Sequence, residues 1–305
     1  GICGCDVHGI VGRNYLKFTA GGAATHSDHG REICHTLYEA SADGCYKVKD
    51  PEKLIRIAKE WGMETEGKDI YELAHEVALE GLMEYGKPFG TQRFLKRAPE
   101  SQQKLWEENE LAPHAIDREV SRSLHMAHMG CSSKPEALVK QSIRAGLSDG
   151  WGGSMMGTEF SDILFGTPKP IETEANLGVM VEENVNIVVH GHDPSLSEMI
   201  CEVADSPEMI AYAKEQGAKG ITISGVCCTS NEVAMRRGIP MAGNFLQQEN
   251  VVLTGACEAI VVDVQCIFPA LGPLSKCFHT KFITTSPIAQ MPDSEFVRFD
   301  AHTAL

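Results

Sequence analysis

Apolar residues in the first half of the chain recur at the three- and four-residue steps of an α-helix. Asp50 suits an N-cap and Pro51 suits the first helical position, and the apolar residues at 54, 55, 58 and 61 then fall on one face. Asp69 precedes a similar pattern. The spacing up to about residue 170 therefore predicts a mainly helical region.

Two further amphipathic segments, 117–129 and 134–145, follow the same rule. Gly130 and Gly146 are expected to end these two helices, because glycine commonly follows the last helical residue. The glycine-containing stretch 146–157 is interpreted as a turn-rich connection.

Beyond about residue 180 the pattern changes to short runs rich in β-branched residues, separated by helical stretches. The predicted strands are 185–189, 220–224, 259–264 and 281–285. The helical stretches are 195–204, 207–216 and 231–237. Such alternation predicts a parallel sheet. We therefore expect an α/β protein with a helical domain over 1–175 and a Rossmann-like domain over 176–305, with the boundary between 165 and 183.

Charge and hydropathy narrow the classes of partner. The 305 residues include 27 Lys and Arg against 42 Asp and Glu, a net charge of −15 that would repel a polyphosphate backbone. We therefore expect no nucleic-acid partner. The most apolar stretch, 259–271, is interrupted by polar residues and proline, so we expect no transmembrane segment.

The cysteine content points to metal chemistry in a reducing compartment. Eleven cysteines is an odd number, and their irregular spacing includes the adjacent pair Cys227 and Cys228. The alternative is that most are buried thiols, since free cysteine packs like a small apolar residue. With no export signal visible, we expect a cytoplasmic protein.

Candidate metal ligands follow three of the predicted strands. His190 and His192 come after the first strand, the adjacent thiols of 227 and 228 after the second, and Cys266 after the third. Ligands of an open parallel sheet gather outside the carboxyl ends of its strands. A mixed His/Cys iron–sulfur site is therefore predicted. Zinc is the competing interpretation, although the close CxxC pairs of structural zinc sites are absent.

Three histidines recur on one predicted helix, in the string AATHSDHGREICHTL. His26, His29 and His35 are separated by three and six residues, and each step of three rises about 4.5 Å along the helix. Such a spiral suits proton transfer near neutral pH, with Glu32 at the missing step. The alternative is a polar helix with structurally satisfied histidines.

These strings together resemble one known family. The chain contains segments similar to those of the nickel-containing carbon monoxide dehydrogenases of anaerobic bacteria and archaea. These segments are GICG, HSDHGRE, DGWGGS, SDILFGTPKP, NIVVHGHDP, GVCCTSNE and VDVQCIFP. The resemblance implies a helical domain followed by Rossmann-like domains. It also implies oxidation of CO with water to CO2 at a nickel–iron–sulfur cluster, with [4Fe-4S] clusters carrying electrons away.

The resemblance assigns roles residue by residue. His192, Cys228 and Cys266 would be metal ligands of the active cluster. Cys3 would be the last thiolate of a second, [4Fe-4S] cluster.

His26 would act as the acid–base group beside the substrate, His29 and His35 would continue a proton relay, and Asp149 would be an acidic group near the reaction. Many relatives have a histidine where this chain has Glu32.

The resemblance also implies components outside this sequence. Three further cysteines of the active cluster and a lysine normally follow Leu305, so we expect no CO oxidation by this polypeptide alone. Implied partners are a ferredoxin-like electron acceptor, a second copy in a homodimer, and acetyl-CoA synthase. The alternatives are a truncated non-catalytic polypeptide and a hybrid-cluster relative that acts on hydroxylamine.

Overall fold

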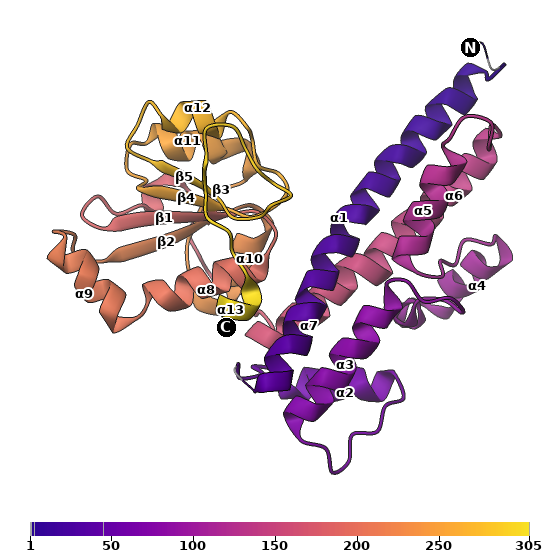
Figure 1. The fold of residues 1–305 in the computed structure, drawn as a ribbon, viewed down its shortest axis with the longest axis horizontal. Coiled ribbons are helices and arrows are strands. Elements are labelled where there is room, and N and C mark those ends of the chain that lie inside the picture. Colours follow the sequence, from indigo (N-terminus) through magenta and orange to yellow (C-terminus); the bar gives the residue numbers. More distant parts are fainter. Residues whose placement is uncertain (1, 3, 45, 305) are drawn as a thin grey trace. The chain divides into compact units, whose positions relative to one another are not determined.

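The computed structural model describes residue 2, residues 4–44 and residues 46–304. It divides into two compact units, Gly1–Leu164 and Phe165–Leu305, and each has its own architecture (Figure 1). The first is helical and the second is built on a parallel sheet, so the predicted α/β fold class is confirmed.

In the first unit the 37-residue helix α1 (Val7–Asp43) packs against α3, α5, α6 and η2. The other helical elements are α2 (Pro51–Glu60), α3 (Ile70–Glu84), η1 (Arg93–Arg97), α4 (Glu100–Glu108), α5 (Ile116–Met126), α6 (Pro135–Ser148), η2 (Asp149–Ser154) and α7 (Met155–Phe165). The packed face of α1 carries Leu16, Ala20 and Ala23, whose small or apolar side chains are almost fully buried. This unit is therefore assembled around one long helix.

Two of the predicted helix starts are confirmed by their caps. The carboxylate of Asp50 accepts a hydrogen bond from the Lys53 N–H at 2.9 Å, and Pro51 is the first residue of α2. Asp69 accepts from the Tyr71 N–H at 2.9 Å at the start of α3. Each carboxylate satisfies a backbone donor that a helix start would leave open.

Two predictions in this unit were wrong, and both concern glycine. Gly146 does not end a helix, because α6 continues to Ser148. The stretch 146–157 is not a turn-rich connection either: its central part, Asp149–Ser154, forms the π-helix η2 between α6 and α7. Packing against α1 and α5 overrides the low helix propensity of glycine here.

In the second unit six parallel strands are ordered β3-β2-β1-β4-β5-β6. The strands are β1 (Val185–His190), β2 (Ile221–Val226), β3 (Met241–Gly243), β4 (Ala259–Val262), β5 (Lys281–Thr284) and β6 (Glu295–Phe296). The helical elements are η3 (Leu177–Val179), α8 (Pro194–Ala204), α9 (Pro207–Glu215), α10 (Cys227–Arg237), η4 (Phe245–Gln247), α11 (Gln248–Leu253), α12 (Leu271–Ser275) and α13 (Ala301–Ala304). This strand order reverses direction between β1 and β4, as in dinucleotide-binding folds.

Helices cover both faces of this sheet (Figure 1). Val188 belongs to the core cluster under α11 and α12, whereas its neighbour Val189 packs with Cys201 of α8 and Val233 of α10. Successive side chains of a strand point to opposite faces, so a strand covered on both faces is apolar throughout. This is why the strands appeared in the sequence as unbroken β-branched runs.

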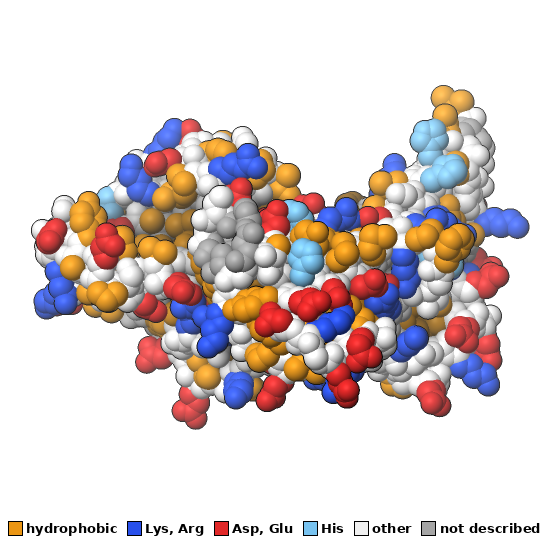
Figure 2. Space-filling model, turned by 60° about the horizontal axis from the view of Figure 1, so that its bottom comes forward, with side chains coloured by type: hydrophobic (Ala, Val, Ile, Leu, Met, Phe, Trp, Pro, Cys, Tyr) orange, Lys and Arg blue, Asp and Glu red, His pale blue; other side chains and the backbone are white. Residues whose placement is uncertain are grey.

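Charged side chains of both signs are interspersed on the face shown in Figure 2. Within the described part of the chain, no helix combines the length and the apolar character needed to cross a membrane.

Candidate metal centre and histidine helix

Three neighbouring strands deliver the predicted metal donors to the same edge of the sheet. β2, β1 and β4 lie side by side, and each ends immediately before a donor segment. His192 follows β1, Cys227 is the first residue of α10 after β2, and Cys266 lies beyond β4. The strand order changes direction between β1 and β4, although the strands themselves stay parallel. At such a point the carboxyl ends of the strands in an open α/β sheet form a crevice.

The donor atoms converge. The ligand atoms of His192, Cys227 and Cys266 all lie within 4.8 Å of one another. The Cys228 sulfur lies 4.0 Å from that of Cys227, and Cys228 is exposed whereas Cys227 is buried. The structure therefore brings together His192 and Cys266 of the predicted set. It adds Cys227, which the sequence had offered only as one of an adjacent pair.

Backbone conformation at this site is strained. Cys227, Gln265 and Cys266 have φ values of 74°, 66° and 58°, a left-handed region that non-glycine residues seldom adopt. Such residues cost on the order of 1–3 kcal/mol each, and they persist where the surrounding structure enforces them. Two of these three residues, Cys227 and Cys266, are members of the donor group, so the strained backbone coincides with the site.

Two buried carboxylates hold the segment that carries His192. Asp263 accepts hydrogen bonds from the backbone N–H groups of His192, at 2.5 Å, and of Val264. Burial, together with the charge of Asp193, raises the pKa of Asp263 well above its ordinary value. Burial likewise raises the pKa of Asp193 to about 6, although its carboxylate accepts from the Ser195 N–H at 2.8 Å.

Gly191 permits this arrangement. Its φ is 136°, and an added Cβ would lie 1.8 Å from a carboxylate oxygen of Asp263. No side chain larger than hydrogen fits between the loop and the carboxylate. The glycine of the HGH string is therefore required for a loop that wraps closely around Asp263.

The donor set has the chemistry of an iron–sulfur or zinc ligand group. Burial raises the pKa of the Cys227 and Cys228 thiols, so proton loss from them needs a compensating positive charge such as a metal. Two thiolates on a single tetrahedral zinc would lie about 3.8 Å apart. The sulfur atoms of Cys227 and Cys228, 4.0 Å apart, are close to this spacing. Sulfur and imidazole donors thus fit the expected cluster, and geometry by itself leaves zinc as the competing metal.

His190 does not join this group. It is 1% exposed, its Nε2 lies 3.1 Å from the side-chain oxygen of Gln248, and burial lowers its pKa. It packs inside the sheet domain, whereas His192 lies two residues further along the loop.

In the helical unit, Asp149 of η2 contacts His26 of α1. The Nδ1 atom of His26 lies 2.5 Å from a carboxylate oxygen of Asp149, and their side chains are 33% and 27% exposed. The hydrogen bond to Asp149 raises the pKa of His26, against the opposing effect of burial. The structure thus joins two of the predicted catalytic residues and favours a proton on this imidazole.

His29 lies one turn further along α1 and has the opposite property. Its Nδ1 atom is shielded from solvent, and its ring faces Gly157 of α7. Burial, together with the positive charge of His26, lowers the pKa of His29 to about 4. At pH 7 roughly one molecule in a thousand would carry a proton there, so His29 is suited to passing a proton on rather than storing it.

His35 and Cys3 complete the predicted set. His35 is 57% exposed, and its Nε2 lies 3.5 Å from the carboxylate of Glu39, so this end of the histidine series reaches solvent. The prediction for Cys3 lies outside the described residues.

The chain also matches known proteins over its full length. The model of the Prismane/CO dehydrogenase family matches residues 1–305. The chain belongs to this family. The resemblance found in the sequence motifs is therefore confirmed at the level of the family.

Relatives in this family are carbon monoxide dehydrogenases. Carbon monoxide dehydrogenase 1 of Methanosarcina mazei is 48% identical over 304 residues, which is 99% of this chain and 48% of the relative. A nickel-free crystal structure of carbon monoxide dehydrogenase from Thermococcus sp. AM4 matches with a TM-score of 0.96 and 49% identity, over 100% of this chain and 49% of that one.

A structure of acetyl-CoA synthase/carbon monoxide dehydrogenase with NiZn[Fe4S4] and NiNi[Fe4S4] clusters matches with a TM-score of 0.95 and 41% identity, over 100% and 46% of the two chains. The chain spans about half the length of the relatives it matches.

Proposed function

We propose that this chain is part of a carbon monoxide dehydrogenase that oxidises CO with water to CO2, two protons and two electrons. The observation that carries the proposal is the convergence of His192, Cys227 and Cys266 at the ends of three adjacent strands. The sequence identity to carbon monoxide dehydrogenases supports the same reaction.

The sheet unit would hold the metal. His192 and Cys266 would each supply one ligand, and Cys228 would supply the thiolate expected from the motif, with Cys227 as a neighbouring sulfur 4.0 Å away. When bound, the nickel–iron–sulfur cluster would supply the redox centre for a two-electron oxidation. Conventional [4Fe-4S] clusters, one of them involving Cys3, would accept the electrons.

The helical unit would handle the protons. His26 would take up a proton at its Nε2 atom, since Asp149 holds Nδ1 and favours the charged ring. His29 would pass the proton along α1 without retaining it, and His35 would release it at the exposed end of the series. The exposed Glu32 stands between them at the step where many relatives have histidine.

Partners follow from the relatives and from the surface of α1. A ferredoxin-like protein would receive the electrons. Acetyl-CoA synthase is a candidate partner because two matching proteins are a carbon monoxide dehydrogenase/acetyl-CoA synthase subunit and an acetyl-CoA synthase/carbon monoxide dehydrogenase. A homodimer is supported by exposed apolar residues along one face of α1, namely Val7, Val11, Tyr15 and Phe18. Removal of two of these side chains, in Tyr15→Ser/Phe18→Ser, should raise the dimer dissociation constant in sedimentation experiments.

The proposal is tested by CO-dependent dye reduction under anaerobic conditions. The assay uses this chain together with the half of the protein that its relatives have beyond the matched region, and we expect activity from that protein. Cys266→Ser should abolish that activity, whereas Cys277→Ser, a change at an exposed thiol outside the donor group, should preserve it. An active Cys266→Ser protein would overturn the proposal.

A further inference from the structure

Gln92, which immediately precedes η1, reaches the π-helix that carries Asp149. Its side chain is 3% exposed, and its amide Nε2 donates a hydrogen bond to the Ser148 carbonyl at 3.1 Å. Ser148 is the last residue of α6, directly before η2. The amide thus satisfies a buried carbonyl at the junction where the helical hydrogen-bond pattern changes.

The change of pattern is visible within η2. The Met155 N–H donates to the Gly150 carbonyl, five residues back instead of the four of an α-helix, and also to the Gly152 carbonyl. Such a turn fits one extra residue into the helix, and π-turns are found frequently at functional sites. A side chain inserted beside the ladder can hold it in this form.

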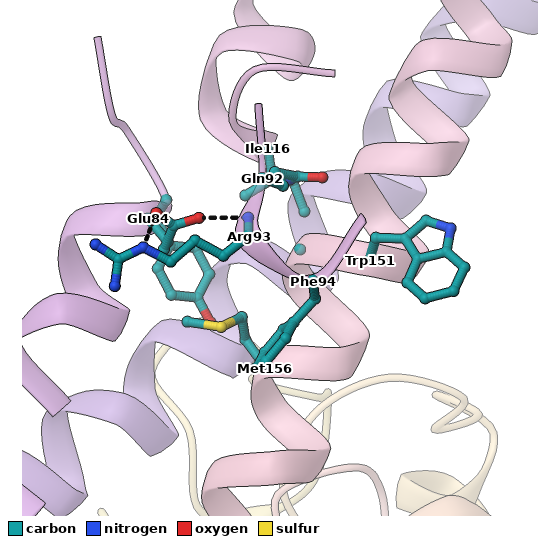
Figure 3. A pocket seen from close by; sticks show the side chains of 9 residues that line it. Glu84, Gln92, Arg93, Phe94, Ile116, Trp151 and Met156 are labelled. Carbon is teal, nitrogen blue, oxygen red and sulfur yellow. Dashed lines mark hydrogen bonds and ion pairs between the residues drawn. The ribbon is translucent and has the colours of Figure 1, made fainter. Parts of the chain in front are cut away.

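Gly152 makes room for the inserted amide. An added Cβ at Gly152 would lie 2.1 Å from the Nε2 of Gln92 and 2.9 Å from its Cδ. Both residues line a cavity of about 10 Å³ together with Ile116 and Trp151 (Figure 3). The Gln92 amide therefore lies directly on the bare face of the π-turn.

The next residue of the same turn, Gly153, lies against His26. An added Cβ at Gly153 would lie 2.8 Å from the Cβ of His26, so the turn and α1 are in close contact. Asp149, the first residue of η2, contacts Nδ1 of His26, and the Ser154 hydroxyl at its far end donates to the same carboxylate oxygen at 3.3 Å. Asp149 is the charged group that faces the His26 ring from η2, and His29 is the titratable neighbour on α1 itself.

We propose that Gln92 is a positioning residue: by lying on Gly152 and binding the Ser148 carbonyl, it holds residues 149–154 in the π-turn that aims Asp149 at His26. The inference rests on the proposed proton-carrying role of His26. Without the Gln92 contact, the backbone hydrogen bonds of the turn can relax to the four-residue spacing of an α-helix. An α-helical turn holds one residue fewer, so Asp149 would rotate about the helix axis and away from His26.

Two alanine variants separate this role from a general effect on folding. Gly152→Ala places a methyl group where the Gln92 amide lies, and the flexible end of that side chain must move away. Gly150→Ala is the matched control, because its added Cβ meets nothing within 4 Å. Both changes raise helix propensity, so both variants should fold.

The measurement is the pKa of His26 from ring chemical shifts in NMR titrations of the metal-free chain, with the signal assigned by its loss in His26→Gln. We expect Gly152→Ala to lower this pKa by about 0.5 unit or more, in the direction of its ordinary value of about 6.5. Gly150→Ala should leave it unchanged. Gln92→Met, which removes the donor at similar volume, should reproduce the effect of Gly152→Ala.

An unchanged His26 pKa in folded Gly152→Ala would overturn the inference, as would an equal shift in Gly150→Ala. Because no metal and no CO are involved, the outcome is independent of the proposed reaction. If CO oxidation were absent but Gly152→Ala still lowered the His26 pKa, only the proposed function would be overturned. If CO oxidation were present but the His26 pKa did not change, only the positioning role of Gln92 would be overturned.

Discussion

Replacement of His29 by glutamine should make the helical unit more resistant to acid. In the folded chain the pKa of His29 is lowered to about 4, whereas in the unfolded chain it takes its ordinary value of 6.5. Between these two values the unfolded chain binds the proton and the folded chain does not. The free energy of unfolding therefore falls as the pH is lowered from about 6.5 to about 4, and this loss ends below pH 4.

The size of this loss follows from the pKa difference. A shift of 2.5 units corresponds to about 3.4 kcal/mol at about 1.36 kcal/mol per unit. The side chain is partly exposed, so solvent screening reduces the figure, and we expect about 2 kcal/mol. His29→Gln removes the titrating group, so wild type should lose about 2 kcal/mol more than the variant between pH 7 and pH 4.

Tryptophan fluorescence during urea unfolding can measure this difference. All three tryptophans, Trp61, Trp106 and Trp151, lie in the helical unit that contains His29, so the signal reports that unit alone. Carboxylates that titrate in the same range contribute equally to both proteins and cancel in the comparison. Parallel stability curves for wild type and His29→Gln from pH 7 to pH 4 would refute the reasoning.

Three further changes test separate parts of the account. Asp149→Asn should lower the pKa of His26, and its cost in stability should be largest below pH 6.5 and disappear as the pH rises past the folded-state pKa; a cost independent of pH would contradict this. Arg144→Met should destabilise the helical unit by about 3–5 kcal/mol, because the Glu119 carboxylate, 2.6 Å away and 1% exposed, loses its buried partner; a fluorescence-detected change below about 1 kcal/mol would speak against it. Gly191→Ala should reduce the iron bound per chain, because its methyl group would collide with the buried carboxylate of Asp263. Gly217→Ala, also at positive φ but in open space, should not reduce it. Equal iron contents in the two variants would argue against the role of the Gly191 loop.

The sequence was sufficient to predict the sheet because its strands are covered on both faces. The run predicted over 185–189 is observed as Val185–His190, and that over 220–224 as Ile221–Val226. The strand Met241–Gly243 was missed, because three residues without a β-branched run carry no strand signal. The shared edge for the donors was predictable from parallel topology alone, since carboxyl ends of parallel strands lie together.

The parts that escaped prediction depend on tertiary contacts. The motif favours Cys228, but the structure places the sulfur of Cys227 in the donor group. Cys227 has a positive φ, and no local pattern in the sequence encodes that angle. The π-helix at 149–154 contains three glycines and resembles a loop in sequence. Its form is stabilised by Gln92, which lies more than fifty residues earlier in the chain. The histidine spacing on α1 was visible in the sequence, whereas the opposite pKa shifts of His26 and His29 require knowledge of their neighbours.

The most direct test of the metal site begins with anaerobic incubation of the purified chain with iron and sulfide. Iron K-edge X-ray absorption and the iron content per chain are then measured. Wild type and Cys277→Ser should bind iron with sulfur and some nitrogen ligation, and His192→Ala and Cys266→Ser should each lose most of it while keeping their helical content. Iron bound equally in all four proteins, or no sulfur-ligated iron in wild type, would contradict the claim that these strand ends form an iron–sulfur centre.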